Sequence, residues 1–220
     1  MNNERLITVI VAGTFLVVYI IYLLLKIRLL SSLNKEFANN NFDKVIEKCE
    51  KDLYLKIVGD FNCDLYTLKA YACKNDIVIL KEKLNYVLDK QYSQEKQEKL
   101  LEYFYHYFLN LDESEYTEKL LDHVHKFDDA SFVKYNDWAY EVIKNGRNDL
   151  TDEMDLSLQN KEFKGFALGT VVYLMALQFE RENRLEEAGE LYLTATQCFL
   201  PNAYYMPKAK HKVEELGRKL

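Results

Sequence analysis

The sequence is poor in the residues that break regular secondary structure. Its 220 residues include only 7 glycines and 2 prolines. Folds built from many short strands need many tight turns, and tight turns depend on these two residues. The scarcity argues against a β-sandwich or β-barrel and favours helices. Apolar residues make up 49% of the chain and charged residues 29%, a balance that predicts a packed core and not a disordered chain.

Motifs of metal, nucleotide and catalytic sites are also missing. The 4 cysteines form no C-x-x-C pair, and together with the 4 histidines they give no zinc-binding spacing. We find no glycine-rich phosphate loop, no nucleophile-elbow motif and no zinc-protease motif. We therefore predict no cofactor, no metal, no catalytic residues and no enzymatic activity. The cysteines are typical of small buried apolar residues in a reducing compartment.

Positive charge is in short supply. The formal net charge is −6, and the chain after residue 30 retains 26 basic and 34 acidic residues. Proteins that bind nucleic acid need a basic stripe that displaces counterions from the phosphates. The sequence shows no such stripe, and we predict that nucleic acid is not a partner.

One long apolar run is present at the N-terminus. Leu6 to Leu25 comprises 20 residues without a charge. At 1.5 Å per residue, a helix of this length covers about 30 Å, the thickness of the hydrocarbon core of a bilayer. Cleaved signal peptides, the competing interpretation, have a shorter apolar region followed by small residues, whereas Lys26-Ile27-Arg28 follows here. We predict a transmembrane anchor in residues 1–30, a separate helical domain in residues 31–220, and the lipid bilayer as a partner of residues 6–25.

Basic residues on one side of this run predict its orientation. Lys26, Arg28 and Lys35 follow the span, while Arg5, offset by Glu4, precedes it. Positive charge tends to stay on the cytoplasmic side. We therefore expect a single-pass protein of the cell membrane with a cytoplasmic C-terminal domain. Because no helix-breaking residue lies between Leu25 and Asn39, the spanning helix is expected to continue into that domain.

The segment 171–201 resembles a tetratricopeptide (TPR) repeat. Large and small apolar residues occupy the positions of that signature, and a proline closes the segment: Met175, Ala176, Phe179, Ala188, Tyr192, Ala195 and Pro201. The resemblance implies pairs of antiparallel helices that stack into an α-solenoid, because one repeat cannot bury its apolar face alone. It also implies a scaffold that binds proteins or peptides, with no catalytic residues.

Candidate turns divide the remaining chain at intervals that suit this repeat. Residues that favour turns cluster at 39–41, 75–76, 112–114, 145–146 and 183. Presumed equivalent positions are 35, 40 and 68 residues apart, near one or two periods of about 34: Val45, Leu80, Leu120 and Ala188. We predict an all-α fold of about five helix pairs and a C-terminal capping helix in residues 203–220. The fourth pair is expected around 132–142 and 150–158.

Aromatic residues are concentrated in Tyr103 to Phe108. Six consecutive rings on a helix cannot all face one core. Tyr103, Tyr105 and His106 are therefore candidates for a partner-binding surface, since tyrosine combines a large contact area with a polar tip. The alternative is that this helix has neighbours on several sides and buries nearly all of the rings.

Acidic residues cluster in two places, 112–115 and 149–155. Both lie where helices are expected to begin, and carboxylates are stabilised there by the exposed backbone amides. The alternative is an acidic docking surface for a basic partner.

Three functional hypotheses follow from these patterns. The first is a membrane-anchored TPR-like adaptor that binds a protein or peptide at the cytoplasmic face. The second places the domain outside the cytoplasm, where it assists secretion or envelope assembly. The third is a structural membrane scaffold that forms a homo-oligomer. The sequence names neither the partner nor the process.

Overall fold

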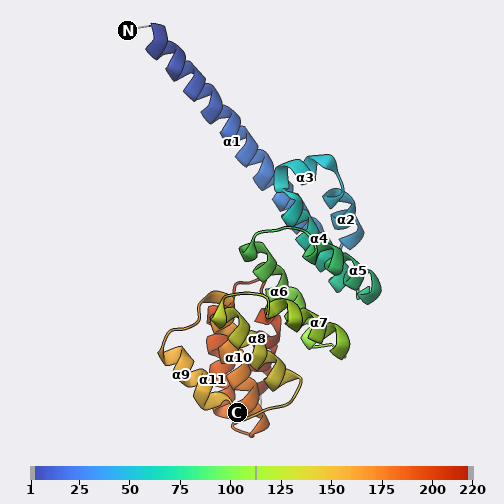
Figure 1. The fold of residues 1–220 in the computed structure, drawn as a ribbon, viewed down its shortest axis with the longest axis vertical. Coiled ribbons are helices and arrows are strands. Elements are labelled where there is room, and N and C mark those ends of the chain that lie inside the picture. The colour runs from blue at the N-terminus through green and yellow to red at the C-terminus, as the bar shows by residue number, and fades with distance from the viewer. Residues whose placement is uncertain (1–2, 112, 218–220) are drawn as a thin grey trace. The chain divides into compact units, whose positions relative to one another are not determined.

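The computed structural model of the protein describes residues 3–111 and 113–217, and this part of the chain is all-α. It contains twelve helices and no strand (Figure 1). The chain divides into two compact units, Met1–Tyr92 and Ser93–Leu220. Unit 1 contains α1 (Asn3–Ala38), α2 (Phe42–Cys49), α3 (Asp52–Val58), α4 (Asp60–Cys73) and α5 (Ile77–Leu88). Unit 2 contains α6 (Gln94–Leu109), α7 (Ser114–Val124), α8 (Ala130–Ile143), α9 (Thr151–Gln159), α10 (Gly165–Arg181), α11 (Leu185–Cys198) and α12 (Met206–Leu216).

Asparagine residues end several helices at the predicted turns. Asn40, Asn75 and Asn183 have φ angles of 58°, 57° and 63°. Asparagine adopts this left-handed conformation more readily than most residues, which allows the chain to leave one helix and begin the next. After Asn75, the side chain of Asp76 caps α5 by accepting a hydrogen bond from the backbone N–H of Ile79 at 3.3 Å. The turn predictions at 39–41, 75–76 and 183 are confirmed.

The core of unit 1 forms around the C-terminal part of α1. Leu29 and Leu33 are buried there against apolar side chains of the next three helices: Val45, Cys49, Tyr54, Val58, Cys63 and Ala70. The expectation that the first helix continues past Leu25 without a break is confirmed, because α1 is one helix to Ala38. Of the four cysteines, Cys49 and Cys63 are buried, whereas Cys73 is exposed, so burial is not common to all of them.

The short helix α3 was not expected. The apolar residues Phe42, Val45, Ile46, Cys49 and Leu53 have the spacing of a single helix, but the structure ends α2 at Cys49 and begins α3 at Asp52. Gly59, with a φ of 95°, separates α3 from α4. This left-handed conformation is accessible to glycine at little cost. Since α3 packs on α1, the break supplies α1 with a further neighbour.

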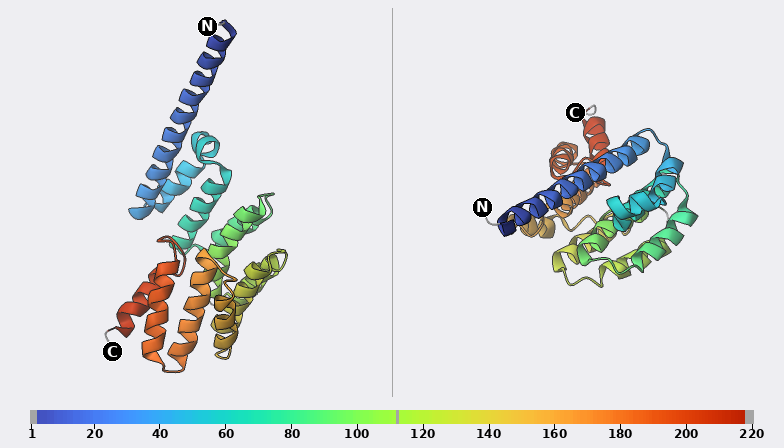
Figure 2. Two further views of the ribbon diagram at one scale, coloured as in Figure 1. Left: turned by 90° about the vertical axis from the view of Figure 1, so that its left-hand side faces the viewer. Right: turned by 90° about the horizontal axis from the view of Figure 1, so that it is seen from above.

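Unit 2 is built around α10. This helix packs on α11 as an antiparallel hairpin, and it also packs on α8 and α9; α12 lies along α11 (Figure 2, left view). The hairpin buries four signature positions completely: Ala176, Ala188, Tyr192 and Ala195. Met175 is also buried, Phe179 is half-buried, and Pro201 is exposed in the turn after α11. Thus the segment 171–201 does form a helical hairpin.

One glycine permits close packing in this unit. A methyl group on Gly169 would lie 2.6 Å from the ring of Phe199, closer than carbon atoms can approach. The glycine therefore allows the end of α11 to return against α10. Because Phe199 begins the loop that leads to α12, this approach helps to position the C-terminal segment.

The predicted fourth pair does not have the form expected for a repeat. Both of its helices exist, as α8 and α9, but each packs on α10. The predicted capping helix is also more than an end cover. Tyr205, which directly precedes this helix, is completely buried and contacts α6, whereas Lys210 and Glu214 lie on the exposed face of the helix.

Candidate functional site

The structure buries two of the three residues that were expected on a partner-binding surface. Tyr105 and His106 have exposed fractions of 0%, while Tyr103 is half-buried. The Tyr105 hydroxyl donates a hydrogen bond to the backbone carbonyl of Asn136 at 3.0 Å. The placement of Tyr105 and His106 on an accessible surface is therefore wrong, because α6 has neighbours on several sides. Binding by Tyr103 stays a prediction.

The chain's own C-terminal segment covers this part of α6. The Tyr205 hydroxyl lies 2.9 Å from Nδ1 of His106, and the Tyr204 ring packs edge-on against Tyr103 with 5.7 Å between centroids. Lys208 adds a hydrogen bond of 2.8 Å to the side-chain oxygen of Asn110. These contacts join residues 98 to 101 positions apart. An aromatic surface that could have held a partner's peptide is occupied by the protein itself.

Burial also controls the charge of His106. It lowers the pKa of the imidazole to about 3, so the ring is neutral near pH 7. Tyr205 and Tyr135, which lie against it, have pKa values well above the ordinary value, because burial disfavours the phenolate. A neutral imidazole enclosed by neutral rings is a packing element of the core.

A separate, open groove lies on unit 2 between α9, α10 and α11. Its volume is about 450 Å³. Apolar side chains of α10 and α11 line its floor: Met175, Phe179 and Leu191. Carboxylates stand on both sides of this floor, Asp152 and Asp155 from α9, and Glu187 and Glu190 from α11. The groove therefore combines an apolar base with two acidic edges.

One basic residue, Arg184, also lines the groove, and acidic neighbours engage it. Its guanidinium forms ion pairs with the carboxylates of Glu187 and Glu182, and the distance from Nη1 to Oε2 of Glu182 is 3.3 Å. The pairing holds the pKa of Glu187 below its ordinary range. The guanidinium also lies over the Phe179 ring, 3.8 Å from its centroid. Arg184 is thus held by Glu182, Glu187 and Phe179, and the other carboxylates keep the edges of the groove acidic.

Sequence reasoning found part of this groove. The acidic cluster at 149–155 lies at the first turn of α9 as expected, and Met175 and Phe179 belong to the repeat signature. It missed the acidic side of α11, since Glu187 and Glu190 form a wall of the groove only in the tertiary structure, where α9 contributes the other wall. The other acidic cluster, 112–115, includes residue 112, which lies outside the described residues.

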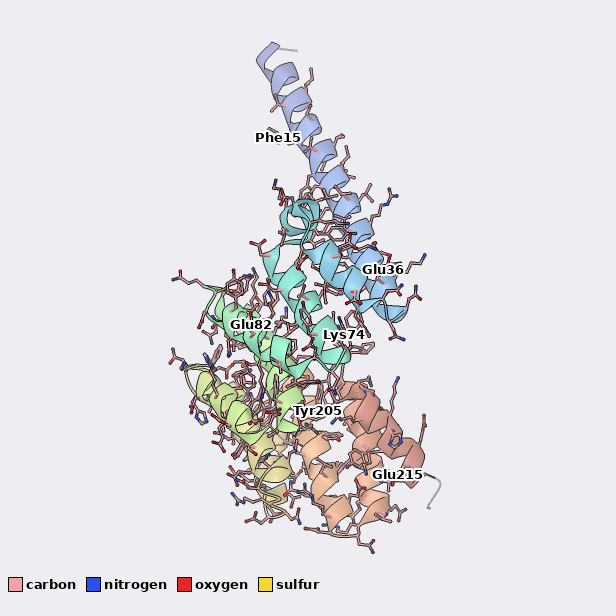
Figure 3. The ribbon with its side chains drawn as sticks, turned by 90° about the vertical axis from the view of Figure 1, so that its right-hand side faces the viewer. Phe15, Glu36, Lys74, Glu82, Tyr205 and Glu215 are labelled. Atoms are coloured by element: carbon pink, nitrogen blue, oxygen red, sulfur yellow. The ribbon has the colours of Figure 1, made fainter. Side chains whose placement is uncertain are left out.

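The N-terminal part of α1 is a second candidate site. The helix is long and apolar enough to cross a membrane, and its apolar part is not buried within the structure. Side chains from Ile10 to Leu24 are exposed; Figure 3 shows Phe15 on the part of α1 that extends beyond the other helices of its unit. The side chain of Leu6 lies outside the described part of the structure. Leu25 is half-buried against the core of unit 1.

Packing of α1 begins one turn before Leu25. The Tyr22 hydroxyl donates a hydrogen bond to the carbonyl oxygen of Ile57 in α3 at 3.2 Å. The apolar surface that remains free of protein contacts therefore ends close to Tyr22.

Comparison with known proteins finds no match: no family model, no curated protein and no solved structure is similar to this chain.

Proposed function

We propose that the protein is a single-pass membrane protein that presents a TPR-like helical domain at the cytoplasmic face and binds a protein or peptide partner there. The exposed apolar helix carries the proposal. Fifteen consecutive described residues, Ile10 to Leu24, present their side chains to the surroundings. In water such a surface is costly at about 25 cal/mol per Å², whereas in a bilayer it is favoured.

The continuity of α1 supports the role of an anchor that also positions the domain. The same helix that is exposed before Tyr22 is packed into unit 1 at Leu29 and Leu33. No flexible linker separates the two parts. A membrane-embedded N-terminal half would therefore hold unit 1 at a short, defined distance from the bilayer. Lys26 and Arg28, which directly follow the free apolar surface, favour the cytoplasmic side.

The groove on unit 2 supports partner binding. It is the kind of concave, apolar and charged surface that peptides use, and its volume lies within the range of about 300–1,000 Å³ typical of binding sites. Helical repeat domains bind proteins through such surfaces. In the proposed role, the anchor concentrates the bound partner at the membrane.

Membrane association tests the anchor. In the Val17→Arg/Ile20→Arg double variant, each arginine adds about 2.5–3.5 kcal/mol to the cost of insertion. We expect the variant to lose most of its association with lipid vesicles in flotation. The matched control, Leu53→Arg/Val78→Arg, replaces exposed apolar residues of unit 1 outside the span and should float like the wild type. Equal flotation of all three proteins would contradict the anchor.

The exposed thiol of Cys73 tests the side of the membrane. An impermeant maleimide applied to intact cells that express the full chain should leave Cys73 unlabelled, and permeabilisation should expose it. A Cys73→Ser variant provides the background from the other thiols. Labelling of Cys73 on intact cells would place the domain outside the cytoplasm and favour the role in secretion or envelope assembly.

A further inference from the structure

The floor of the groove in unit 2 is shaped for apolar side chains. Met175 comes from the buried face of α10, and Phe179 and Leu191 are half-buried beside it. The helices α9 and α11 form two walls, and the space between them is open to solvent and is not an enclosed cavity. Covering this floor would remove apolar area from water, which favours a ligand with an apolar stripe.

The walls select for positive charge. Asp155 on α9 and Glu190 on α11 are exposed on opposite walls, and each has a second carboxylate one turn away, Asp152 and Glu187. Arg184 is paired with Glu187 and Glu182 and does not reverse this balance. Phosphate-rich ligands are repelled by such a surface, whereas lysine and arginine on both flanks of an apolar stripe are attracted to it.

One class of ligand has both properties. An amphipathic helix presents apolar residues at i, i+3, i+4 and i+7 on one face, and its flanking lysines can extend their charged ends sideways. We propose that the groove between α9, α10 and α11 binds a basic amphipathic helix of a partner protein. This proposal rests on the proposed function and specifies the chemistry of the partner.

The lysine-rich end of this chain is already used elsewhere. In α12, Ala209 and Leu216 are buried in the core beside α11. Lys212 forms ion pairs with Glu180 at 2.6 Å and with Glu215 at 3.4 Å. The lysine-rich helix α12 of the same chain is therefore not the occupant of the groove.

The test uses the full chain in nonionic micelles and a designed peptide. The probe is a fluorescent peptide of leucine and lysine with leucine at helical i, i+3, i+4 and i+7 positions. A scrambled peptide has the same composition without the apolar stripe. Fluorescence anisotropy should show saturable binding of the probe and much weaker binding of the scrambled peptide, and rising ionic strength should weaken probe binding.

Charge reversal locates the site. The Asp155→Lys/Glu190→Lys variant should weaken binding about tenfold or more, since it reverses both walls. The matched control, Glu115→Lys/Asp122→Lys, changes the net charge equally on the exposed surface of α7 and should bind like the wild type. Leu191→Ala should weaken binding through the floor, and circular dichroism checks that each variant keeps its helices.

Several results would overturn the inference. Equal binding of the probe and the scrambled peptide would mean that charge alone acts. Equal weakening by both double variants would place the site elsewhere. Dissociation of a homo-oligomer by the Asp155/Glu190 reversal alone would identify a second copy as the occupant. A protein that floats with vesicles but binds no probe would refute the groove proposal and leave the anchor intact, so the two failures are distinguishable.

Discussion

Two helices rich in large apolar side chains have opposite environments in this protein. In α1, Phe15 has an exposed fraction of 73%, and in α6, Phe104 has an exposed fraction of 0%. Both residues lie in segments with apolar side chains on every face of the helix. The difference lies in their neighbours. Segments around α6 contribute Tyr116, Tyr135, Phe166, Tyr204 and Tyr205, whereas no described helix of unit 1 covers α1 before Tyr22.

This comparison distinguishes two environments in which a helix with apolar side chains on all faces is stable. A helix that is apolar on all faces must be enclosed by protein or by lipid. The chain provides the enclosure for α6 through contacts such as Tyr205 with His106. The described helices of unit 1 provide none for α1 from Ile10 to Tyr19, which is why a bilayer is the environment that we propose for it.

The largest expected effect tests this contrast directly. Phe104→Ala should lower the free energy of unfolding of unit 2 by about 3–5 kcal/mol, because a buried ring leaves a cavity. Phe15→Ala should leave the unfolding transition unchanged, since no core contact is lost. Denaturant unfolding followed by circular dichroism and by the single tryptophan, Trp138 in α8, measures both.

Leu33→Ala and Leu24→Ala provide the same comparison within α1. Leu33 is buried in unit 1, and its substitution should lower the free energy of unfolding by about 2–5 kcal/mol. Leu24 is exposed, and its substitution should leave the free energy of unfolding almost unchanged. A large loss of stability for Phe15→Ala or Leu24→Ala would show that the N-terminal part of α1 packs on protein.

A smaller effect is expected from substitution of two glycines, Gly169 in α10 and Gly189 in α11. Gly169→Ala should destabilise unit 2 by about 1–3 kcal/mol, because the new methyl group would overlap the Phe199 ring. Gly189→Ala places its methyl group 4.0 Å from Leu216, an ordinary contact, and should stabilise the helix by up to about 1 kcal/mol. If both substitutions stabilise the protein, Phe199 does not pack against α10 as described.

An effect of similar size concerns the pH dependence of the buried core around α6. His106 is neutral in the folded protein because burial lowers its pKa to about 3, whereas in the unfolded chain its pKa is about 6.5. The unfolded state therefore binds the extra proton as pH falls below about 6.5, and folding loses stability. The loss from this group should reach about 1.4 kcal/mol at pH 5.5.

A variant isolates this contribution. Burial raises the pKa of Glu102 to about 7. The contribution of Glu102 to the pH dependence of stability therefore has the opposite sign to that of His106, because protonation of this carboxyl stabilises the fold as pH falls. Since the wild type and His106→Gln share Glu102, the difference between their unfolding free energies should change between pH 7 and pH 5.5. A pH-independent difference would mean that the pKa of His106 is the same in the folded and unfolded states, and that burial does not lower it.

Local patterns predicted most of the secondary structure. The turns at Asn40, Asn75 and Asn183 and the capping aspartate Asp76 act through their own backbone and a few neighbouring residues. They are therefore readable without knowledge of the fold. The separate helix α3 was missed, since the signal that divides it from α2 is weak and its apolar residues continue the same spacing.

Local sequence patterns predicted less of the candidate site than of the secondary structure. The acidic start of α9 and the apolar positions of α10 were recognised, but the groove also requires Glu187 and Glu190 of α11 on the facing wall. The aromatic residues of α6 were recognised as unusual, but their neighbours were not. A contact such as Lys208 with Asn110 spans 98 positions and has no local signal.

By itself, the sequence determined an all-α chain, the positions of several turns and an N-terminal helix that is long and apolar enough to cross a membrane. These properties follow from composition and from periodicity over a few turns of helix. Only the tertiary structure decided which apolar helix is enclosed by protein. The burial of Tyr105 and His106, and the groove between α9 and α11, arise from segments that are distant in sequence, and their packing depends on the whole fold.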